Sequence, residues 1–530
     1  MKTIYKVLCT LCLIAASITN SYAASEAEYG KVAKSWILNA DGSQEYRYSM
    51  ELTLFTHTAM NSTYGESFIL YNPKFQELEI ITSYTRQKDG TRINTPENAF
   101  VEVLPRNAAD APAYNHLKEM VVVHTGLELG ATIYLEYVLK TKPGYFAALD
   151  ISEFLQETSP VKTYSATVCV PENTPIHCQL TGTTVRTTEE IKNGIKTINC
   201  TLNNVPALSR EPFQAQNRNN SPRLTASTYS SLEDALAILS KSLHIGTNME
   251  AEAFATYTTE EATTGKEKAE LIQKHIVQNM GTCQVTPEQT GYKTRNASLA
   301  LRTAYGTLAE KAILLTVMLN AVEVPAEIVV IYPGNMQPVG LKSIKGFAVK
   351  AKIDGKNTYL SPASMVVPTI EQRGELDQLY TLSGKPVEVK ATPLTIAETK
   401  EVKLTKEQSK NGYIVYTLPI ISKGIDVWGV RTLNTQRSEL FELPAMLDEE
   451  ITYVITLDEG INIKASAPVS ISNAAGQFSQ TMLQEGNKVT VKRAIKLNKQ
   501  QYLPAEYRQM RELINEWVNP SRQTLLFPVN

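Results

Sequence analysis

Residues 304–319 read AYGTLAEKAILLTVML, a run that is apolar nearly all round a helix. Glu310 and Lys311 are its only charged residues. A helix without a polar face is normally buried on every side, so the run predicts the central helix of a domain. Thr307 stands just before the helix and offers the hydroxyl oxygen typical of an N-cap.

Helices are expected before this run and strands after it. Segments 232–239 and 269–280 have the 3.6-residue apolar spacing of amphipathic helices. The turn Asp354-Gly355 predicts a two-residue hairpin. We therefore expect residues 228–375 to form an α+β unit, with extended segments at 327–332, 347–353 and 358–360.

This unit resembles the transglutaminase-like, papain-related core. Two stretches carry the resemblance. In the first, 304–326, a turn containing Gly306 leads into the buried helix, and Val324-Pro325-Ala326 follows the helix. The other, 346–362, is the hairpin ending in Leu360-Ser361-Pro362. The resemblance implies a Cys at the start of the helix, a His at the start of one strand and an Asp on the next.

All three catalytic positions carry other residues. Leu308 stands at the cysteine position, Gly346 at the histidine position (Lys345 if the register shifts by one) and Ser361 at the aspartate position. Counting back from the hairpin turn sets Ala348 opposite Ser361. Gly346 and Ser361 are then diagonal neighbours, roughly 7–8 Å apart, which would suit a His–Asp pair. Leucine, glycine and serine cannot supply the nucleophile, base and carboxylate.

The distribution of histidine and cysteine leads to the same expectation without an alignment. His275 is the last of six histidines and Cys283 the last cysteine. The family order of Cys, then His, then Asp therefore cannot be built from any cysteine of the chain. We expect a protein with an enzyme-like fold that is not itself an enzyme.

Several candidate residues have more than one interpretation. Cys283 and His275 form a catalytic pair only if they meet in a cleft, and otherwise are an unpaired thiol and a surface histidine. Thr307 is a nucleophile or, more simply, an N-cap. Glu310 and Lys311 cap the helix in contact with solvent, or they line the former active-site groove. The candidate binding residues are Thr307, Glu310, Lys311 and Lys345.

Residues 24–215 predict an all-β, sandwich-like domain. Tyr71-Asn72-Pro73, 88–91 and 126–130 resemble the β domain that precedes transglutaminase-like cores in a group of exported bacterial proteins. The polar segment 217–222 is the predicted linker. The extended segments lie at 36–38, 46–55, 75–84, 120–124 and 132–139.

Residues 386–530 predict a C-terminal β domain that closes on one amphipathic helix. Alternation at 413–418, 451–457 and 488–495 indicates strands. Pro504 is expected to open the helix and Asn519-Pro520 to end it. Its apolar face is formed by Tyr507, Met510, Leu513, Ile514 and Trp517.

The first 23 residues have the features of a secretory signal peptide. Lys2 and Lys6 precede an apolar segment at 7–18, and Ser21-Tyr22-Ala23 fits the small-x-small cleavage rule. The apolar segment is too short to span a bilayer. We therefore expect cleavage after Ala23 and a periplasmic or secreted protein with no later transmembrane segment.

Four cysteines remain after that cleavage, at 169, 178, 200 and 283. An oxidising compartment permits a disulfide, and Cys178–Cys200 is the expected pair. The alternative is that these thiols are small buried apolar side chains on strands.

Charge and motifs exclude several functions. Lys and Arg total 52 against 54 Asp and Glu, and the basic residues are scattered, so nucleic acid is not an expected partner. The sequence has no metal-ligand spacing and no phosphate loop, so no metal or cofactor is expected. Asp426 and the cluster 448–450 are interpreted as solvated turns.

The leading hypothesis is a non-catalytic transglutaminase-like protein of the bacterial envelope. It would bind an envelope protein, a peptide or a glycan through the groove or the β domains. A different hypothesis is a cysteine-type peptidase, amidase or other hydrolase with an unrecognised site. A third is a structural envelope module whose β domains present an apolar patch or a free sheet edge.

Overall fold

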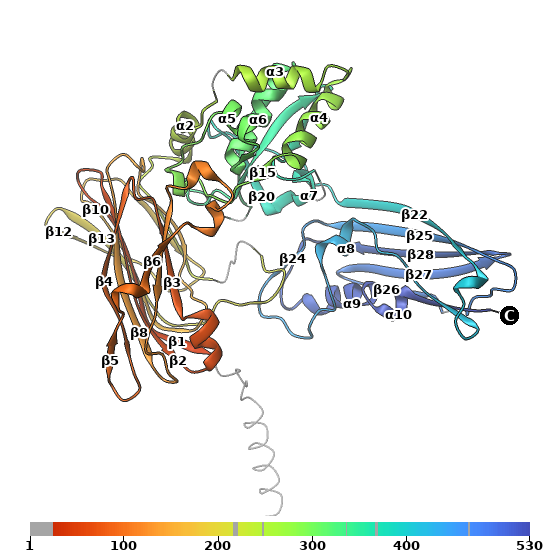
Figure 1. Ribbon diagram of the computed structural model, residues 1–530, viewed down its shortest axis with the longest axis horizontal. Helices are drawn as coiled ribbons and strands as arrows, with labels where there is room; N and C mark the ends of the chain where they lie inside the picture. The colour runs from red at the N-terminus through yellow and green to blue at the C-terminus, as the bar shows by residue number, and fades with distance from the viewer. Residues whose placement is uncertain are drawn as a thin grey trace, which may run out of the picture.

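A computed structural model describes residues 25–215, 221–245, 248–334, 336–365, 369–464 and 467–529. It has the predicted α+β, multidomain architecture (Figure 1), with a β domain, an α+β core and a second β domain in chain order. The predicted signal peptide, its cleavage site and most of the predicted linker lie outside the described residues. None of the helices in the described ranges has the length and apolarity needed to cross a membrane.

The N-terminal domain is built on one eight-stranded sheet. Its strands are antiparallel except for β1 and β10, which pair in parallel. Alternate residues of β10, such as Tyr164, Ala166 and Val168, point into the core, as the period of two requires. In sheet order the strands are β12 (Thr188–Lys192), β13 (Ile195–Val205), β10 (Val161–Pro171), β1 (Ala27–Leu38), β2 (Gln44–Leu54), β8 (Thr132–Thr141), β4 (Gln76–Arg86) and β5 (Arg92–Asn94).

Two three-stranded sheets add to this domain. One contains β14, which follows the predicted linker, so the domain extends beyond its predicted end at residue 215. Between β6 and β7 the chain forms two short 3-10 turns, η3 (Arg106–Ala108) and η4 (Pro112–Tyr114). The sheets are β11 (His177–Thr181), β14 (Arg223–Ser227) and β9 (Asp150–Phe154), and β3 (Glu66–Tyr71), β7 (Lys118–Val123) and β6 (Phe100–Val103).

The disulfide expected between Cys178 and Cys200 is not formed. Both are free thiols, Cys178 on β11 and Cys200 on β13, which belong to different sheets. Burial, with a smaller effect of Cys200, raises the pKa of the Cys178 thiol to about 11. The two residues therefore act as apolar side chains of the sandwich, which is the alternative given above.

The core packs helices around α6 and against one five-stranded sheet. Helix α6 (Leu308–Ala321) is buried nearly all round, as its sequence predicts. The sequence pattern did not reveal α3, which buries only Ala251 and Ala255, nor the short helices α5, of seven residues, and α7, of four. Besides α6, the core helices are α2 (Leu232–Ser242), α3 (Met249–Thr258), α4 (Gly265–Gln278), α5 (Ala297–Thr303) and α7 (Ile370–Arg373).

The core sheet contains the predicted hairpin in the predicted register. Ile353 pairs with Lys356 and Val349 with Leu360, so Ser361 is the residue that continues opposite Ala348. The sheet extends past residue 375, because β20 pairs with β17. Its order is β19 (Lys356–Leu360), β18 (Gly346–Ile353), β17 (Ala326–Pro333), β20 (Asp377–Thr381) and β21 (Pro386–Val387).

The C-terminal domain is a five-stranded sheet covered by α9 (Tyr507–Trp517), which packs on β27 and β28. The five residues predicted for its apolar face are all buried. The chain does not close on this helix, because α10 (Pro520–Gln523) and β30 (Thr524–Pro528) follow, and β30 pairs with β23 (Tyr413–Thr417). The sheet is β22 (Leu394–Leu404), β25 (Leu447–Leu457), β28 (Lys488–Leu497), β27 (Gly476–Glu485) and β26 (Val469–Asn473).

The acidic cluster at 448–450 is not a solvated turn. It lies inside β25, whose residues alternate between buried and accessible. Asp448 and Glu450 pair with Lys496 and Lys492, but Glu449 is completely buried and one of its carboxylate oxygens has no hydrogen-bond partner in the described part of the chain. Asp426, on α8 (Gly424–Trp428), is half-buried and accepts a hydrogen bond from Ile421 N.

Candidate functional site

The candidate site lies at the N-terminus of α6. Thr307 is the N-cap, as predicted, and forms a capping box with Glu310. Thr307 Oγ1 accepts from Glu310 N at 3.3 Å, and Glu310 Oε2 accepts from Thr307 N at 2.9 Å. The hydroxyl at the helix entrance is therefore occupied by a structural hydrogen bond.

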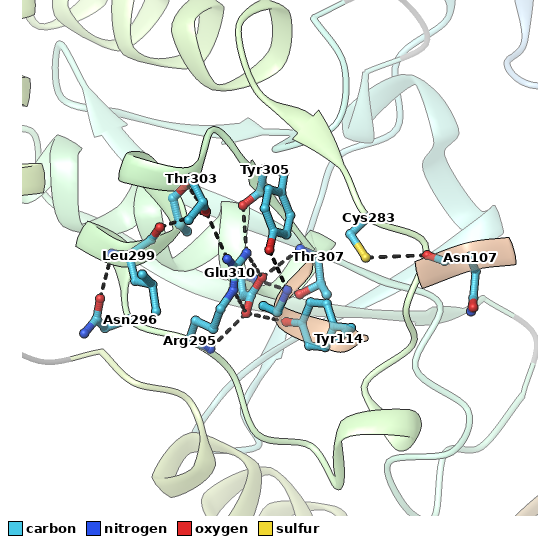
Figure 2. Close-up of polar contacts among 12 residues, drawn as sticks. Asn107, Tyr114, Cys283, Arg295, Asn296, Leu299, Thr303, Tyr305, Thr307 and Glu310 are labelled. Atoms are coloured by element: carbon cyan, nitrogen blue, oxygen red, sulfur yellow. Dashed lines mark hydrogen bonds and ion pairs between the residues drawn. The ribbon is translucent and has the colours of Figure 1, made fainter. Parts of the chain in front are cut away.

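Glu310 is fully buried and is the centre of a polar network (Figure 2). Its Oε1 accepts hydrogen bonds from Tyr114 Oη at 2.5 Å and from Arg295 N and Nε at 2.9 and 3.0 Å. Arg295 Nη2 donates to Oε2 at 2.9 Å and to Tyr305 O at 2.7 Å. Burial alone would raise the pKa of Glu310, but the hydrogen bonds from Arg295 and Tyr114 hold it below its usual value.

Lys311 is also fully buried. Its ammonium donates to Met280 O at 3.2 Å and to Thr282 Oγ1 at 2.9 Å, and burial lowers the pKa of the amine. The expectation that Glu310 and Lys311 meet solvent is therefore wrong, and neither lines the groove described next. Both instead hold the start of α6 against neighbouring segments of the same chain. A charged group inside a protein needs hydrogen-bond or ion-pair partners of this kind.

A groove of about 260 Å³ opens at the first residue of α6. We call it the α6 groove, and its central residues are Cys283, Thr307, Leu308, Lys345, Gly346 and Phe347. Leu308, Lys345 and Gly346 also line an adjoining hollow of about 380 Å³, where Ser361 lies. The structure thus brings together Leu308, Gly346 and Ser361, the three positions to which the sequence resemblance assigns the catalytic residues.

The polar groups around the α6 groove are held by other residues. Lys345 Nζ lies 2.5 Å from Asp377 Oδ1, and burial lowers the pKa of the lysine despite this partner. Ser361 Oγ accepts from Ala363 N and Ser364 N, both at 3.2 Å. Gly346 has room for a side chain, because a Cβ there would meet only Ile331 Cδ1, at 4.0 Å.

Cys283 lies in the α6 groove, but His275 has other partners. The Cys283 thiol faces Asn107 O at 3.6 Å, and burial raises its pKa (Figure 2). The His275 ring contacts the Asn279 amide at 3.2 Å and lies tilted against the Phe254 ring, with the centroids 4.7 Å apart. None of these three residues lines the α6 groove. The geometry favours the plainer interpretation of this pair.

Two contributors to the site come from far along the chain and were missed. Tyr114 belongs to η4 of the N-terminal domain, 196 residues before Glu310. Asp377 belongs to β20 and neutralises Lys345. Neither residue stands in a motif, and only the tertiary fold places them here. No group of three or more His, Cys, Asp or Glu side chains able to hold a metal ion occurs among the described residues.

The fold defines a three-domain protein in which an α+β core lies between two β domains. Residues 40–209 match a domain of unknown function with a solved structure, DUF3857, and residues 413–527 match a second such domain, DUF3858. The crystal structure of a putative protease from Parabacteroides distasonis ATCC 8503 is 53% identical, with a TM-score of 0.89. The match covers 95% of this chain and 99% of that one, so the chain belongs to the family of that protein.

Other similarities are far weaker. A putative cysteine protease from Cytophaga hutchinsonii is 14% identical over 41% of this chain and 76% of its own, with a TM-score of 0.21. An M1 zinc metallopeptidase from Deinococcus radiodurans is 12% identical over 39% of this chain and 44% of its own, also with a TM-score of 0.21. No curated protein matches the chain.

Proposed function

We propose that the chain is an exported, non-catalytic member of this family that binds a peptide in the α6 groove. The observation that carries the proposal is Leu308, an aliphatic side chain at the first position of α6, where a catalytic relative needs a thiolate. Gly346 and Ser361 beside it provide neither a base nor a carboxylate. The α6 groove can therefore hold a peptide, but it lacks the thiolate, the base and the carboxylate that would cleave it.

The chemistry of the α6 groove favours an apolar side chain of that peptide. Leu308, Ile344 and Phe347 contribute apolar surface, and ligand pockets are mainly of this character with a few polar groups for orientation. The two lysines of the lining are paired with acids, Lys342 with Glu288 and Lys345 with Asp377. Neither lysine therefore favours a strongly anionic ligand.

A cysteine-type peptidase or amidase is the second candidate, because Cys283 lies in the α6 groove and the Parabacteroides distasonis relative is a putative protease. Two observations weigh against it. The thiol is nearly buried with a raised pKa, whereas a nucleophilic cysteine needs a lowered one. His275, which precedes Cys283 in the sequence, has different partners and does not line the groove.

Filling the α6 groove should remove peptide binding. Peptides selected from a random phage-displayed library on the wild-type protein are expected to bind Gly346→Trp at least roughly tenfold more weakly, because the indole would occupy the site of the ligand side chain. Ile191→Trp is the matched control, since Ile191 is 51% exposed on β12 of the N-terminal domain. Selected peptides that bind all three proteins equally would contradict the proposal.

Restoring the cysteine should create an activated thiol. We expect the thiol of Leu308→Cys to have a lower apparent pKa than that of Leu271→Cys, because it stands at a helix N-terminus and Leu271 lies within α4. Alkylation by iodoacetamide across pH 6–10, followed by peptide mass spectrometry, measures both. Leu271 is 40% exposed, so access does not limit the control. Equal apparent pKa values would show that Leu308 is not at an activating position.

A further inference from the structure

A second cavity, of about 270 Å³, lies in the N-terminal domain where it meets the core. Its lining combines the large sheet (Trp36 of β1, Tyr46 of β2 and Tyr137 of β8) with residues of both small sheets, Phe68 of β3 and Glu153 of β9. Core residues complete it. We call it the aromatic pocket, and its volume is near the lower end of the range for small-molecule sites.

The aromatic pocket presents a continuous aromatic surface. The ring centroids of Trp36 and Tyr46 are 5.6 Å apart, and those of Tyr46 and Tyr137 are 6.1 Å apart. All three side chains are only half-buried although they lie on the inner face of a sheet. Phe146 of the N-terminal domain and Tyr292 of the core also line the pocket, and their ring centroids are 6.3 Å apart. Aromatic rings of this kind offer flat apolar faces with polar edges.

Planar polar side chains accompany these rings, and the carboxylates among them already have partners. Glu153 accepts from Lys34 Nζ at 2.6 Å, and Glu45 accepts from Arg47 Nη2 at 2.8 Å. Asp150 Oδ2 accepts from Lys342 N at 2.8 Å, and Glu288 pairs with the Lys342 ammonium. The pocket therefore has carboxylate oxygens without a large excess of negative charge.

We infer that the aromatic pocket binds a neutral sugar ring of the pyranose type. One face of a pyranose carries C–H groups that stack on an aromatic ring, and its hydroxyls donate to carboxylate and amide oxygens. A paired carboxylate retains lone pairs for such donors, since it has about four acceptor sites. An organic cation would be attracted by rings and by unneutralised carboxylates together. Here Glu45, Glu153 and Glu288 are each paired with a cation, and Asp150 is held by the backbone N–H groups of Leu341 and Lys342.

The aromatic pocket is separate from the α6 groove, although the two are neighbours. Glu288, Tyr292 and Lys342 line both, so the ion pair between Glu288 and Lys342 stands in their common wall. The inference goes beyond the proposed peptide binding, because none of Trp36, Tyr46 or Tyr137 lines the groove. A failure of one assignment leaves the other standing.

Saturation-transfer NMR on the full mature chain tests the inference. The probes are methyl glucoside, methyl galactoside, methyl mannoside and N-acetylglucosamine, with choline as the cationic alternative. We expect transfer to at least one pyranoside, a roughly tenfold weaker affinity in Trp36→Ala, and near wild-type affinity in Trp36→Phe, which keeps a ring. Gly346→Trp, in the α6 groove, should leave the sugar signal unchanged.

Controls separate a lost site from a lost fold. Thermal unfolding is measured for each variant, and Glu45→Gln serves as a second pocket variant because it removes a charge but no ring. Tyr257→Ala is the control for a ring outside the pocket, since Tyr257 is 76% exposed on α3. The inference is wrong if no pyranoside receives saturation, if choline alone does, or if folded Trp36→Ala and Glu45→Gln both bind sugar as the wild type does.

Discussion

Replacing Glu310 by alanine is expected to cost about 3–5 kcal/mol of core stability, which is typical for removing one partner of a buried ion pair. The change leaves Arg295, whose side chain is 11% exposed, without its carboxylate. It also removes the acceptor for Tyr114 Oη and half of the capping box of α6. These losses affect one helix end, so the effect should be concentrated in α6 and its neighbours.

Hydrogen exchange read by mass spectrometry is the suitable measurement, because the three tryptophans, at 36, 428 and 517, all lie outside the core. Peptides from α6 should lose protection in Glu310→Ala. The matched control is Glu270→Ala on α4, where the carboxylate is 59% exposed and 3.7 Å from Lys266. Such surface pairs contribute less than about 1 kcal/mol. Protection of α6 that is equal in both variants would contradict a structural role for the network.

Glu449→Gln is expected to stabilise the C-terminal domain at high pH and to change little at low pH. Burial raises the pKa of Glu449 to about 8 in the folded protein, whereas the ordinary glutamate value is 4.5. The raising effect of burial exceeds the lowering effect of the hydrogen bond from Ile425 N. The folded protein therefore retains a proton at this position that the unfolded chain releases above about pH 4.5.

The direction of the pH dependence follows from this difference. Below the unfolded pKa the carboxyl is neutral in both states, and as pH rises toward 8 the wild-type domain loses stability. Each pKa unit corresponds to about 1.4 kcal/mol, so the difference between the variant and the wild type should reach a few kcal/mol by pH 9. Glutamine has the same shape as the protonated acid, so it fits the confined space beside Gly424. That space is tight, because a Cβ placed on Gly424 would lie only 2.1 Å from Glu449 Oε2.

Urea unfolding followed by tryptophan fluorescence measures this difference, since Trp428 and Trp517 belong to the C-terminal domain. Glu450→Gln is the matched control, because Glu450 is the next residue of β25 and pairs with Lys492 at 2.9 Å on the accessible face. Its effect should be small at every pH. A stability difference between Glu449→Gln and the wild type that does not grow from pH 5 to pH 9 would show that Glu449 is ionised in the folded protein.

Local patterns were enough to predict the elements that position the site. The all-round apolar run gave α6, and the Asp354-Gly355 turn gave the β18–β19 register. The same patterns contained signals that were not used. A helix buried on every side must bury Glu310 and Lys311, and the alternation of β25 places Glu449 on the same face as Leu447 and Ile451.

Long-range contacts had no comparable signal. Tyr114 reaches Glu310 only because η4 of the N-terminal domain packs on the core, and one sequence cannot reveal such a pairing. The aromatic pocket could not be predicted from the sequence either, because Trp36, Tyr46 and Tyr137 become neighbours only through the sheet order β1-β2-β8. Their strand positions were predictable, but their common cavity was not.

The central claim is that the α6 groove binds without catalysing a reaction. The most direct test measures fluorescent casein digestion and dansylcadaverine incorporation by the purified wild-type protein and by Cys283→Ala, with and without iodoacetamide. The account predicts background rates in every case. Activity of the wild type that disappears in Cys283→Ala and after alkylation would contradict it and establish a cysteine enzyme.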